Sequence, residues 1–268
     1  MASLGRGSAL REVSSVPAYP RTSGRCASGD EELRPVAIRY QAVFLDRDGT
    51  LCRNSEEKAR ERDRAIGLIL GREGFQLAPE VPMQAFWRAM EQPGIRPVNT
   101  LAREEAFWRT WYRLILEDHG VGQRSEELAA ELYCHFCFHR MMELYPETVP
   151  VLEALKARGL RLGVISDTFP SLEESLRAMG IAGYFESFTA SSLVGAGKPD
   201  PRIFQAATRS LGVEPEVSIF IDDCKEEADG AREQGFTAFH LDREQPGPDF
   251  VRWTIASLED VLKFLGLG

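Results

Sequence analysis

One ten-residue stretch constrains this chain more than any other: Ala42–Leu51, with the sequence AVFLDRDGTL. Its first part, Ala42–Leu45, is a short apolar run typical of a strand that is buried on both faces. Asp46 and Asp48 follow, and a spacing of two at a strand end puts both carboxylates on the same side of the backbone. Carboxylates this close repel unless a cation or a proton separates them, which indicates a charged site. Asp, Arg and Gly are also ordinary turn formers after a strand, so the stretch alone leaves both interpretations open.

Three further motifs follow in order, each at the end of an expected strand. They are Val164–Asp167 (VISD), Gly197–Pro201 (GKPDP) and Ile219–Asp223 (IFIDD). Together with the DxDGTL string, they resemble the four motifs of the haloacid dehalogenase superfamily, most of whose members are phosphatases. The resemblance runs from about residue 36 to near the C-terminus. It implies a doubly wound, Rossmann-like α/β core with a parallel sheet.

The composition describes a globular chain and restricts its partners. Hydrophobic residues make up 43% of the 268, which is ample for a buried core and too high for a disordered chain. The net charge of −9 argues against a nucleic-acid groove or an anionic membrane surface as a partner. No apolar run approaches the roughly 20 residues that span a bilayer. We therefore expect a soluble protein, either a monomer or a homodimer.

The cysteines do not look like a disulfide framework, because their number is odd and their positions are scattered. A reducing compartment fits best, so we expect a cytoplasmic location. They are Cys26, Cys52, Cys134, Cys137 and Cys224.

The segment Cys134–His139 (CHFCFH) invites a zinc interpretation. Within the helix expected there, Cys134 and Cys137 lie on one face, and His135 and His139 lie on another. Four such ligands do not converge on one tetrahedral ion. Buried core cysteines are the better interpretation. The tryptophans of the same region are likewise expected to pack the lid rather than to form a stacking platform: Trp87, Trp108 and Trp111.

Two segments differ in texture from the rest of the chain. Residues 1–35 are rich in Ser, Gly, Arg and Pro without hydrophobic periodicity, so we expect a disordered N-terminal tail. Four arginines against one acid in residues 1–28 resemble an organelle transit peptide, which is the less favoured alternative. Residues 54–145 carry helical periodicity, as at Phe107, Trp111 and Ile115, and show no strand pattern. We expect an inserted, all-helical cap domain there. Its predicted helices are 55–71, 81–92, 101–118 and 125–144.

From residue 146 the chain alternates between helix and strand. Repeated β–α units predict a parallel sheet covered by helices on both faces, with ligands at the carboxyl ends of the strands. Residues 36–53 and 146–268 are therefore the expected core domain. The predicted strands are 161–165, 188–190, 217–221 and 237–241. The predicted helices are 149–158, 172–179, 201–211, 225–234 and 257–265.

The resemblance implies a role for each acid. Asp46 is the nucleophile that becomes an aspartyl phosphate, and Asp48 is the general acid and base. Asp46, the backbone carbonyl of Asp48, and Asp223 hold a Mg²⁺ ion, which offsets charge as a carboxylate approaches a phosphate dianion. Asp222 and Glu227 are outer acids of that metal site. An alternative for one of these acids is a simple interaction with the N-terminus of the following helix.

The same resemblance assigns the remaining site residues. Lys198 holds both Asp46 and the phosphate, although an isolated lysine is usually a solvated surface residue. Ser166 binds a phosphoryl oxygen, or else caps a helix. Thr50 supports the turn after the first motif at the substrate site. Asp167 departs from the family pattern, and it either turns away to cap the following turn or recognises an amine or hydroxyl of the substrate.

We therefore expect a Mg²⁺-dependent phosphatase that hydrolyses a small-molecule phosphate monoester. A dehalogenase is disfavoured, because those members usually carry a non-acidic residue where Asp48 stands. A phosphomutase or phosphotransferase uses the same four motifs and stays open. A catalytically inactive binding or regulatory module is a further alternative, against which the intact acids and Lys198 argue. The substrate itself is not encoded in a helical cap in any transferable way.

Overall fold

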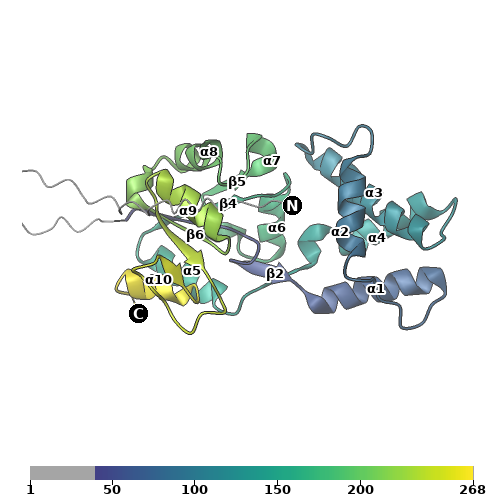
Figure 1. Cartoon of the computed structure of the whole chain (residues 1–268), viewed down its shortest axis with the longest axis horizontal. Coiled ribbons are helices and arrows are strands. Elements are labelled where there is room, and N and C mark those ends of the chain that lie inside the picture. The colour runs from purple at the N-terminus through teal and green to yellow at the C-terminus, as the bar shows by residue number, and fades with distance from the viewer. Residues whose placement is uncertain (1–39, 268) are drawn as a thin grey trace, which may run out of the picture. The chain divides into compact units, whose positions relative to one another are not determined.

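The structure is a computed structural model that describes residues 40–267, without the side chain of Phe138. The predicted tail, residues 1–35, lies outside the described residues. The core is a six-stranded parallel sheet with the strand order β5-β4-β1-β6-β7-β8 (Figure 1). The doubly wound α/β class expected from the motifs is therefore confirmed. The strands are β1 (Ala42–Leu45), β4 (Arg161–Ser166), β5 (Ser187–Ala190), β6 (Ser218–Asp222), β7 (Thr237–Leu241) and β8 (Thr254–Ile255).

Strand β1 lies at the centre of the sheet because all four of its residues are apolar and fully buried. Alternate residues point to opposite faces. Val43 and Leu45 pack into one hydrophobic cluster, which includes residues of α5, α6 and α10. Ala42 and Phe44 pack into the other, with residues of α8 and α9. The core helices are α5 (Thr148–Ala157), α6 (Leu172–Ala178), α7 (Ser191–Val194), α8 (Pro201–Leu211), α9 (Lys225–Glu233) and α10 (Glu259–Phe264).

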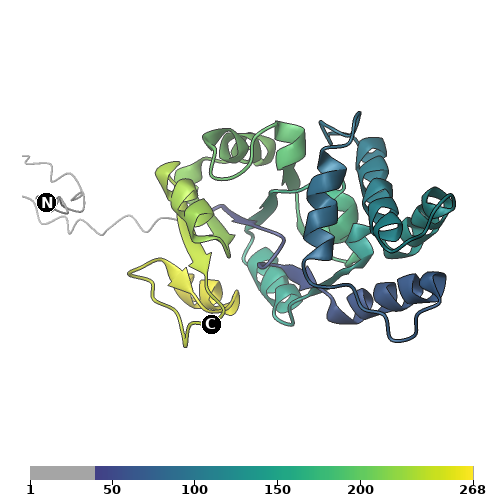
Figure 2. The ribbon, with the colours of Figure 1, turned by 45° about the vertical axis from the view of Figure 1, so that its right-hand side comes forward.

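Four helices of the insert pack around a separate hydrophobic cluster. The apolar face expected on the third helix is buried there, with Phe107 and Ile115 at 0% exposure and Trp111 at 6%. The division of the chain into a core and a cap domain at residues 53 and 146 stays a prediction. These helices are α1 (Glu56–Leu70), α2 (Val81–Met90), α3 (Leu101–Asp118) and α4 (Ser125–Phe136), and they lie together in Figure 2.

The insert is not purely helical, and the prediction of one long helix over 125–144 was wrong. Helix α4 ends at Phe136, since Cys137 is extended (φ −60°, ψ 149°). A short 3-10 turn, Phe138–Arg140, and strand β3 (Met142–Leu144) follow. β3 pairs antiparallel with β2 (Cys52–Asn54), so the two ends of the insert form a ribbon. Strands of three residues are too short to show an alternating pattern.

The insert also contacts the core directly. Glu104 of α3 is 4% exposed and accepts hydrogen bonds from the backbone N–H of Ser171 (2.9 Å) and from its hydroxyl (2.5 Å). Phe169, in the loop before α6, stacks on Phe86 of α2 at 6.2 Å and meets Trp108 of α3 edge-on at 5.8 Å. The loop after β4 is therefore shared between the sheet and the inserted helices.

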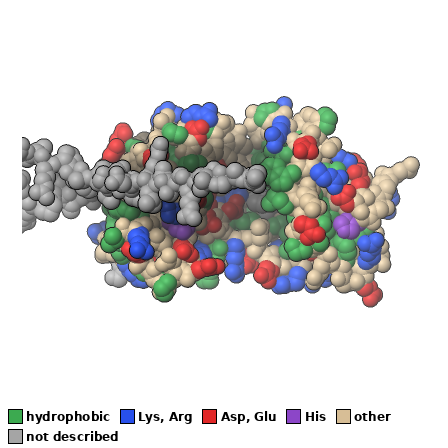
Figure 3. All heavy atoms as spheres, viewed as in Figure 1, with side chains coloured by type: hydrophobic (Ala, Val, Ile, Leu, Met, Phe, Trp, Pro, Cys, Tyr) green, Lys and Arg blue, Asp and Glu red, His purple; other side chains and the backbone are tan. Residues whose placement is uncertain are grey.

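Two features of the described residues concern the predicted partners: the distribution of surface charge and the length of the apolar helices. On the face shown in Figure 3, acidic and basic side chains are interspersed rather than gathered into a field of one sign. No helix within residues 40–267 has the length and apolar character needed to cross a membrane. The predictions of no nucleic-acid partner and of an oligomeric state stay predictions.

Candidate active site

The predicted site residues converge at the carboxyl edge of three adjacent strands. Asp46 follows β1, Ser166 is the last residue of β4, and Asp222 is the last residue of β6. β1 pairs with both β4 and β6 in parallel register, so these three strand ends are neighbours. Asp46, Ser166 and Asp222 are buried, with exposed fractions of 5%, 1% and 1%.

Lys198 is the charge centre of this edge. Its Nζ lies 2.7 Å from Oδ1 of Asp46, 2.6 Å from Oδ2 of Asp222 and 2.7 Å from Oε2 of Glu227. The side chain is 1% exposed, so Lys198 is not a solvated surface lysine. The loop that carries it runs directly into α8, where Asp200 is the N-cap and Pro201 is the first residue. Glu227, which we expected as an outer acid of a metal site, forms an ion pair with Lys198.

Burial and mutual repulsion raise the proton affinity of the acids. Burial, with the nearby carboxylates of Asp222 and Asp48, raises the pKa of Asp46 to about 7, although Lys198 opposes the rise. Burial, with the carboxylate of Glu227, likewise raises the pKa of Asp222 to about 7. Burial would lower the pKa of Lys198, but the three carboxylates around it raise that pKa well above the ordinary value. Lys198 alone therefore does not neutralise the site.

Asp48 is held by Arg47, a residue to which the sequence analysis gave no role. Arg47 is 1% exposed and donates from Nε to Oδ1 of Asp48 (3.0 Å) and from Nη2 to Oδ2 (2.7 Å). Its Nη2 also donates to Oγ1 of Thr168 (2.8 Å), and its Nη1 donates to Oγ of Ser175 (3.2 Å). In the sequence, the one local indication of this role is that Arg47 lies between Asp46 and Asp48. An arginine at that place is also common in an ordinary turn after a strand, so the pattern does not predict the contact.

The donor set beside Asp46 suits a small hard cation. The carboxylate of Asp223 lies so close to Gly49 that an added Cβ there would be 2.0 Å from Oδ2, and Gly49 has φ +77°. Only glycine therefore leaves room for that carboxylate against the turn after Asp48. Within residues 40–267, no three His, Cys, Asp or Glu side chains are gathered as a metal site. Two carboxylates, Asp46 and Asp223, with a backbone carbonyl and waters are nevertheless a set that Mg²⁺ accepts.

A second arginine, Arg243, holds the turn after the first motif. It donates from Nε to the carbonyl of Gly49 (3.2 Å) and from Nη2 to the carbonyl of Thr50 (2.9 Å). Its guanidinium also lies over the ring of Tyr145 at 3.5 Å and pairs with Glu147 at 2.5 Å. Arg243 follows β7, far along the chain from the motif, so no local pattern pointed to it.

Thr50 is buried behind the first motif, whereas Asp167 contacts the loop of Lys198. Thr50 is fully buried, and its Oγ1 has no hydrogen-bond partner among the described residues. Asp167 is exposed, and its Oδ1 accepts from the backbone N–H of Lys198 at 3.1 Å. The carboxylate does turn to a backbone N–H, but that donor belongs to the loop of Lys198 and not to the turn that follows Asp167. Gly197 permits this approach, since a Cβ there would be 2.8 Å from Oδ1.

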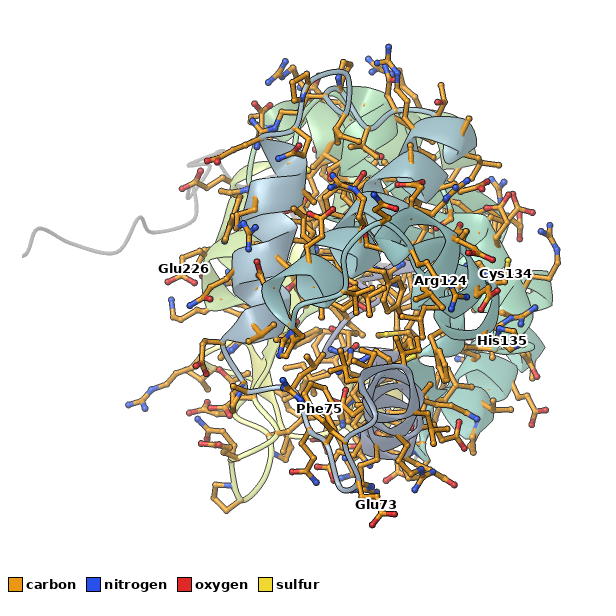
Figure 4. The ribbon with its side chains drawn as sticks, turned by 90° about the vertical axis from the view of Figure 1, so that its right-hand side faces the viewer. Glu73, Phe75, Arg124, Cys134, His135 and Glu226 are labelled. Carbon is orange, nitrogen blue, oxygen red and sulfur yellow. The ribbon has the colours of Figure 1, made fainter. Side chains whose placement is uncertain are left out.

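The Cys134–His139 segment does not assemble a zinc site in the described residues. Cys134 is exposed, so the expectation of two buried cysteines was wrong for this one, whereas Cys137 is buried. The prediction that Cys137 and His139 lie on different faces of one helix was wrong, since Sγ of Cys137 lies 3.0 Å from Nε2 of His139. Both residues fall beyond the end of α4, so helical spacing does not separate them. Cys134 and His135 are both solvent-exposed, on α4 at the side of the molecule shown in Figure 4.

Comparisons with known proteins agree with this architecture. A family model for haloacid dehalogenase-like hydrolases matches residues 40–235. A phosphatase from Mycobacterium tuberculosis is 33% identical over 237 residues, 85% of this chain and 100% of the relative. A phosphoserine phosphatase from Thermus thermophilus is 34% identical over 167 residues, 60% of this chain and 64% of the relative. The crystal structure of a HAD phosphatase from Thermococcus onnurineus has a TM-score of 0.54 at 25% identity, covering 84% of this chain and 98% of its own.

Proposed function

We propose a specific activity for this chain, which belongs to the haloacid dehalogenase-like hydrolases: it hydrolyses a small-molecule phosphate monoester through an aspartyl-phosphate intermediate. The observation that carries the proposal is the buried ion pair between Lys198 and Asp46 at the carboxyl edge of the sheet. A carboxylate fixed beside an ammonium group can receive a phosphoryl group, because that ammonium group offsets part of the phosphoryl charge. The relatives that are named phosphatases support this assignment.

Two proton transfers at Asp48 accompany the proposed reaction. An oxygen of Asp46 attacks phosphorus, the bond from phosphorus to the ester oxygen breaks, and Asp48 gives a proton to the departing oxygen. Asp48 then takes a proton from a water that attacks the phosphoryl group on Asp46, and inorganic phosphate leaves. We assign Ser166 and Lys198 to the phosphoryl oxygens, Thr50 to support of the turn, and Asp167 to the position of the Lys198 loop.

We propose Mg²⁺ as the cofactor. The residues that would hold it are Asp46 and Asp223 through their carboxylates and Asp48 through its backbone carbonyl. The cation would offset the charge of the phosphate dianion and of the carboxylates around it. The support is the number of carboxylates that share the single ammonium group of Lys198, since Asp46, Asp222 and Glu227 all lie within 2.7 Å of its Nζ.

The proposal is tested with the full chain on a panel of phosphate monoesters, with and without Mg²⁺. We expect turnover that disappears in Asp46→Asn and falls at least 100-fold in Lys198→Met, because the lysine touches the nucleophile. Lys225→Met is the matched control, since Lys225 is an exposed lysine that pairs only with Asp229 at 2.6 Å among the contacts of the described chain. Retained turnover in Asp46→Asn contradicts the mechanism. Absence of turnover on the whole panel favours a binding or regulatory module.

We further propose a cytoplasmic location, because the four described cysteines, Cys52, Cys134, Cys137 and Cys224, are free thiols.

A further inference from the structure

The inserted helices line a half-open cavity of about 370 Å³. A cavity of about 150 Å³ is already large enough to bind benzene, so this one has room for a ring-sized organic group. Its lining comes from all four helices and from the end of the β2–β3 ribbon where Asn54 pairs with Met142. The lining residues are Asn54, Ser55, Ala59, Arg62, Pro82, Met83, Phe86, Trp108, Trp111, Tyr112, Phe136 and Met141.

The β2–β3 ribbon connects this cavity to the first motif. Cys52, at one end of β2, has its Sγ 3.9 Å from Oδ1 of Asp48. Asn54, at the other end of β2, lines the cavity. Two residue steps of a strand measure about 7 Å, so Asn54 lies about 7 Å along β2 from the residue whose thiol contacts Asp48. Ser55 and Met141 close this end, joined by a backbone hydrogen bond of 2.8 Å.

The loop after β4 makes a second, independent connection. Phe169 lies three residues beyond Ser166, and its ring stacks on Phe86 at 6.2 Å with an interplanar angle of 13°. The same ring meets Trp108 edge-on at 5.8 Å. Phe86 and Trp108 are lining residues, so one wall of the cavity packs on the loop that follows Ser166, the proposed phosphate ligand.

The chemistry of the lining is aromatic, with a single cation. Five of the lining residues carry aromatic rings, and none carries a carboxylate. Arg62 lines the cavity and lies over the ring of Trp111 at 5.7 Å. The guanidinium of Arg62 is already paired with Asp63 at 2.8 Å, so the lining residues offer a ligand neither a carboxylate nor an unpaired cation. Such a lining favours a neutral ring, which packs edge-on or offset against the aromatic faces.

The polar atoms of two lining rings already have partners in the protein. Nε1 of Trp111 donates to the carbonyl of Pro82 at 2.8 Å, and the hydroxyl of Tyr112 donates to the carbonyl of Phe136 at 2.8 Å. These rings therefore recognise a ligand by contact with their faces and edges and not by hydrogen bonds. Met83 and Met141 add flexible, polarisable walls that adapt to the outline of a ring.

We propose that this cavity takes the organic part of the substrate and that the substrate is a phosphate monoester of a planar aromatic alcohol. The inference rests on the proposed function, because it names the substrate class of the same site. Ala59 is the position where the cavity can be filled with least disturbance, as its side chain is small and faces the cavity from α1.

The test compares Ala59→Phe with Arg60→Phe on 2-naphthyl phosphate and on glycerol 2-phosphate. Arg60 is the adjacent residue of α1, and it is exposed and pairs with Glu56 on the surface. We expect Ala59→Phe to lower kcat/KM for the naphthyl ester at least tenfold and to change the glycerol ester less than threefold. We expect Arg60→Phe to change neither. Equal losses for both esters in Ala59→Phe, or no loss for either, overturn the inference.

A binding measurement separates failure of this inference from failure of the proposed function. In Asp46→Asn, 2-naphthol is titrated while tryptophan fluorescence is recorded, because Trp108 and Trp111 line the cavity. Saturable quenching that is lost in Asp46→Asn with Ala59→Phe supports the cavity, even if no phosphate ester is hydrolysed. Hydrolysis of phosphate esters together with absence of quenching sustains the function and overturns the substrate class.

Discussion

Arg47 donates to both carboxylate oxygens of its neighbour Asp48, at 3.0 Å and 2.7 Å. The guanidinium is buried, whereas the side chain of Asp48 is 45% exposed. The fork of an arginine fixes the plane of a carboxylate in a way that a lysine does not. Arg47 thereby orients the proposed acid and base of the reaction, while Thr168 and Ser175 hold Arg47 itself.

Replacement of Arg47 is expected to act mainly through proton transfer. In Arg47→Met the carboxylate of Asp48 loses its orientation, so hydrolysis of an alkyl phosphate should fall about 10–100-fold. An aryl ester such as p-nitrophenyl phosphate needs little protonation of its leaving group, so its first chemical step should fall much less. Single-turnover rates on both esters measure the difference. Equal losses on both esters would assign Arg47 a purely structural role, which the melting temperature of the variant checks independently.

Asp48→Asn separates the two proposed roles of Asp48. The asparagine keeps the backbone carbonyl and nearly the same shape but cannot transfer a proton. With p-nitrophenyl phosphate we expect a burst of nitrophenol near one equivalent per enzyme, followed by slow turnover, because the second step has lost its base. With an alkyl phosphate the first step itself should slow by about 10²–10⁴-fold.

Rapid-quench measurement of nitrophenol and of the phosphorylated enzyme checks this expectation. Asp46→Asn is the control and should give no burst, since it has no nucleophilic carboxylate. Wild-type rates for Asp48→Asn on both ester types would show that Asp48 is not the acid and base.

The metal-free protein should lose stability as the pH rises. Asp46 and Asp222 have pKa values of about 7 in the folded protein, raised from 3.8 by burial first and by neighbouring carboxylates second. A raised pKa contributes stability that is complete below the unfolded value and is lost as the pH rises through the folded value. Melting temperatures in excess chelator should therefore fall between pH 5 and pH 7.5. Asp46→Asn should show a shallower slope, and identical slopes in the two proteins would contradict the assignment.

Glu104 is expected to couple the inserted helices to the core. Its carboxylate accepts two hydrogen bonds from Ser171, and it is buried. Glu104→Ala leaves the backbone N–H of Ser171 without that partner, which costs about 1–3 kcal/mol of folding free energy. Urea unfolding measures the change. Glu105→Ala is the matched control, because Glu105 is exposed and makes a long surface ion pair of 3.7 Å with Arg109. This substitution should lower the free energy of unfolding by less than about 0.5 kcal/mol.

The helices, strands and acidic site residues that the sequence predicted are those that depend on a short stretch of neighbouring residues. Asp46, Ser166 and Asp222 could be placed at one sheet edge because each ends an apolar strand, and parallel strands bring their carboxyl ends together. Predicted helices and strands start and stop within two residues of the observed ones, except for the last helix of the insert. The two acids of the first motif, Asp46 and Asp48, likewise predicted a charged site.

What the sequence did not show depends on contacts between distant residues. Arg47 reaches Thr168 and Ser175, 121 and 128 residues away, so its part in the site follows only from the packed loop after β4. The β2–β3 ribbon pairs residues about ninety positions apart, in strands of three residues. Trp108 and Trp111 pack in the insert as predicted, whereas the same prediction was wrong for Trp87, which is 56% exposed. The cavity beside Trp108 and Trp111 depends on how four helices meet.

The last prediction concerns the metal. We expect turnover to require Mg²⁺ and to be inhibited by Ca²⁺, because Mg²⁺ keeps a near-octahedral shell while Ca²⁺ takes six to eight ligands and loosens the attack geometry. Binding should also be visible without turnover. At pH 7.5, Mg²⁺ should raise the melting temperature of the wild-type protein, since it offsets charge on Asp46 and Asp223. The rise should shrink in Asp223→Asn and persist in Asp229→Asn, since Asp229 is an acid of α9 that pairs with Lys225 and whose side chain is 43% exposed. Undiminished turnover in excess chelator, or an equal rise in both variants, would remove Mg²⁺ from the proposed mechanism.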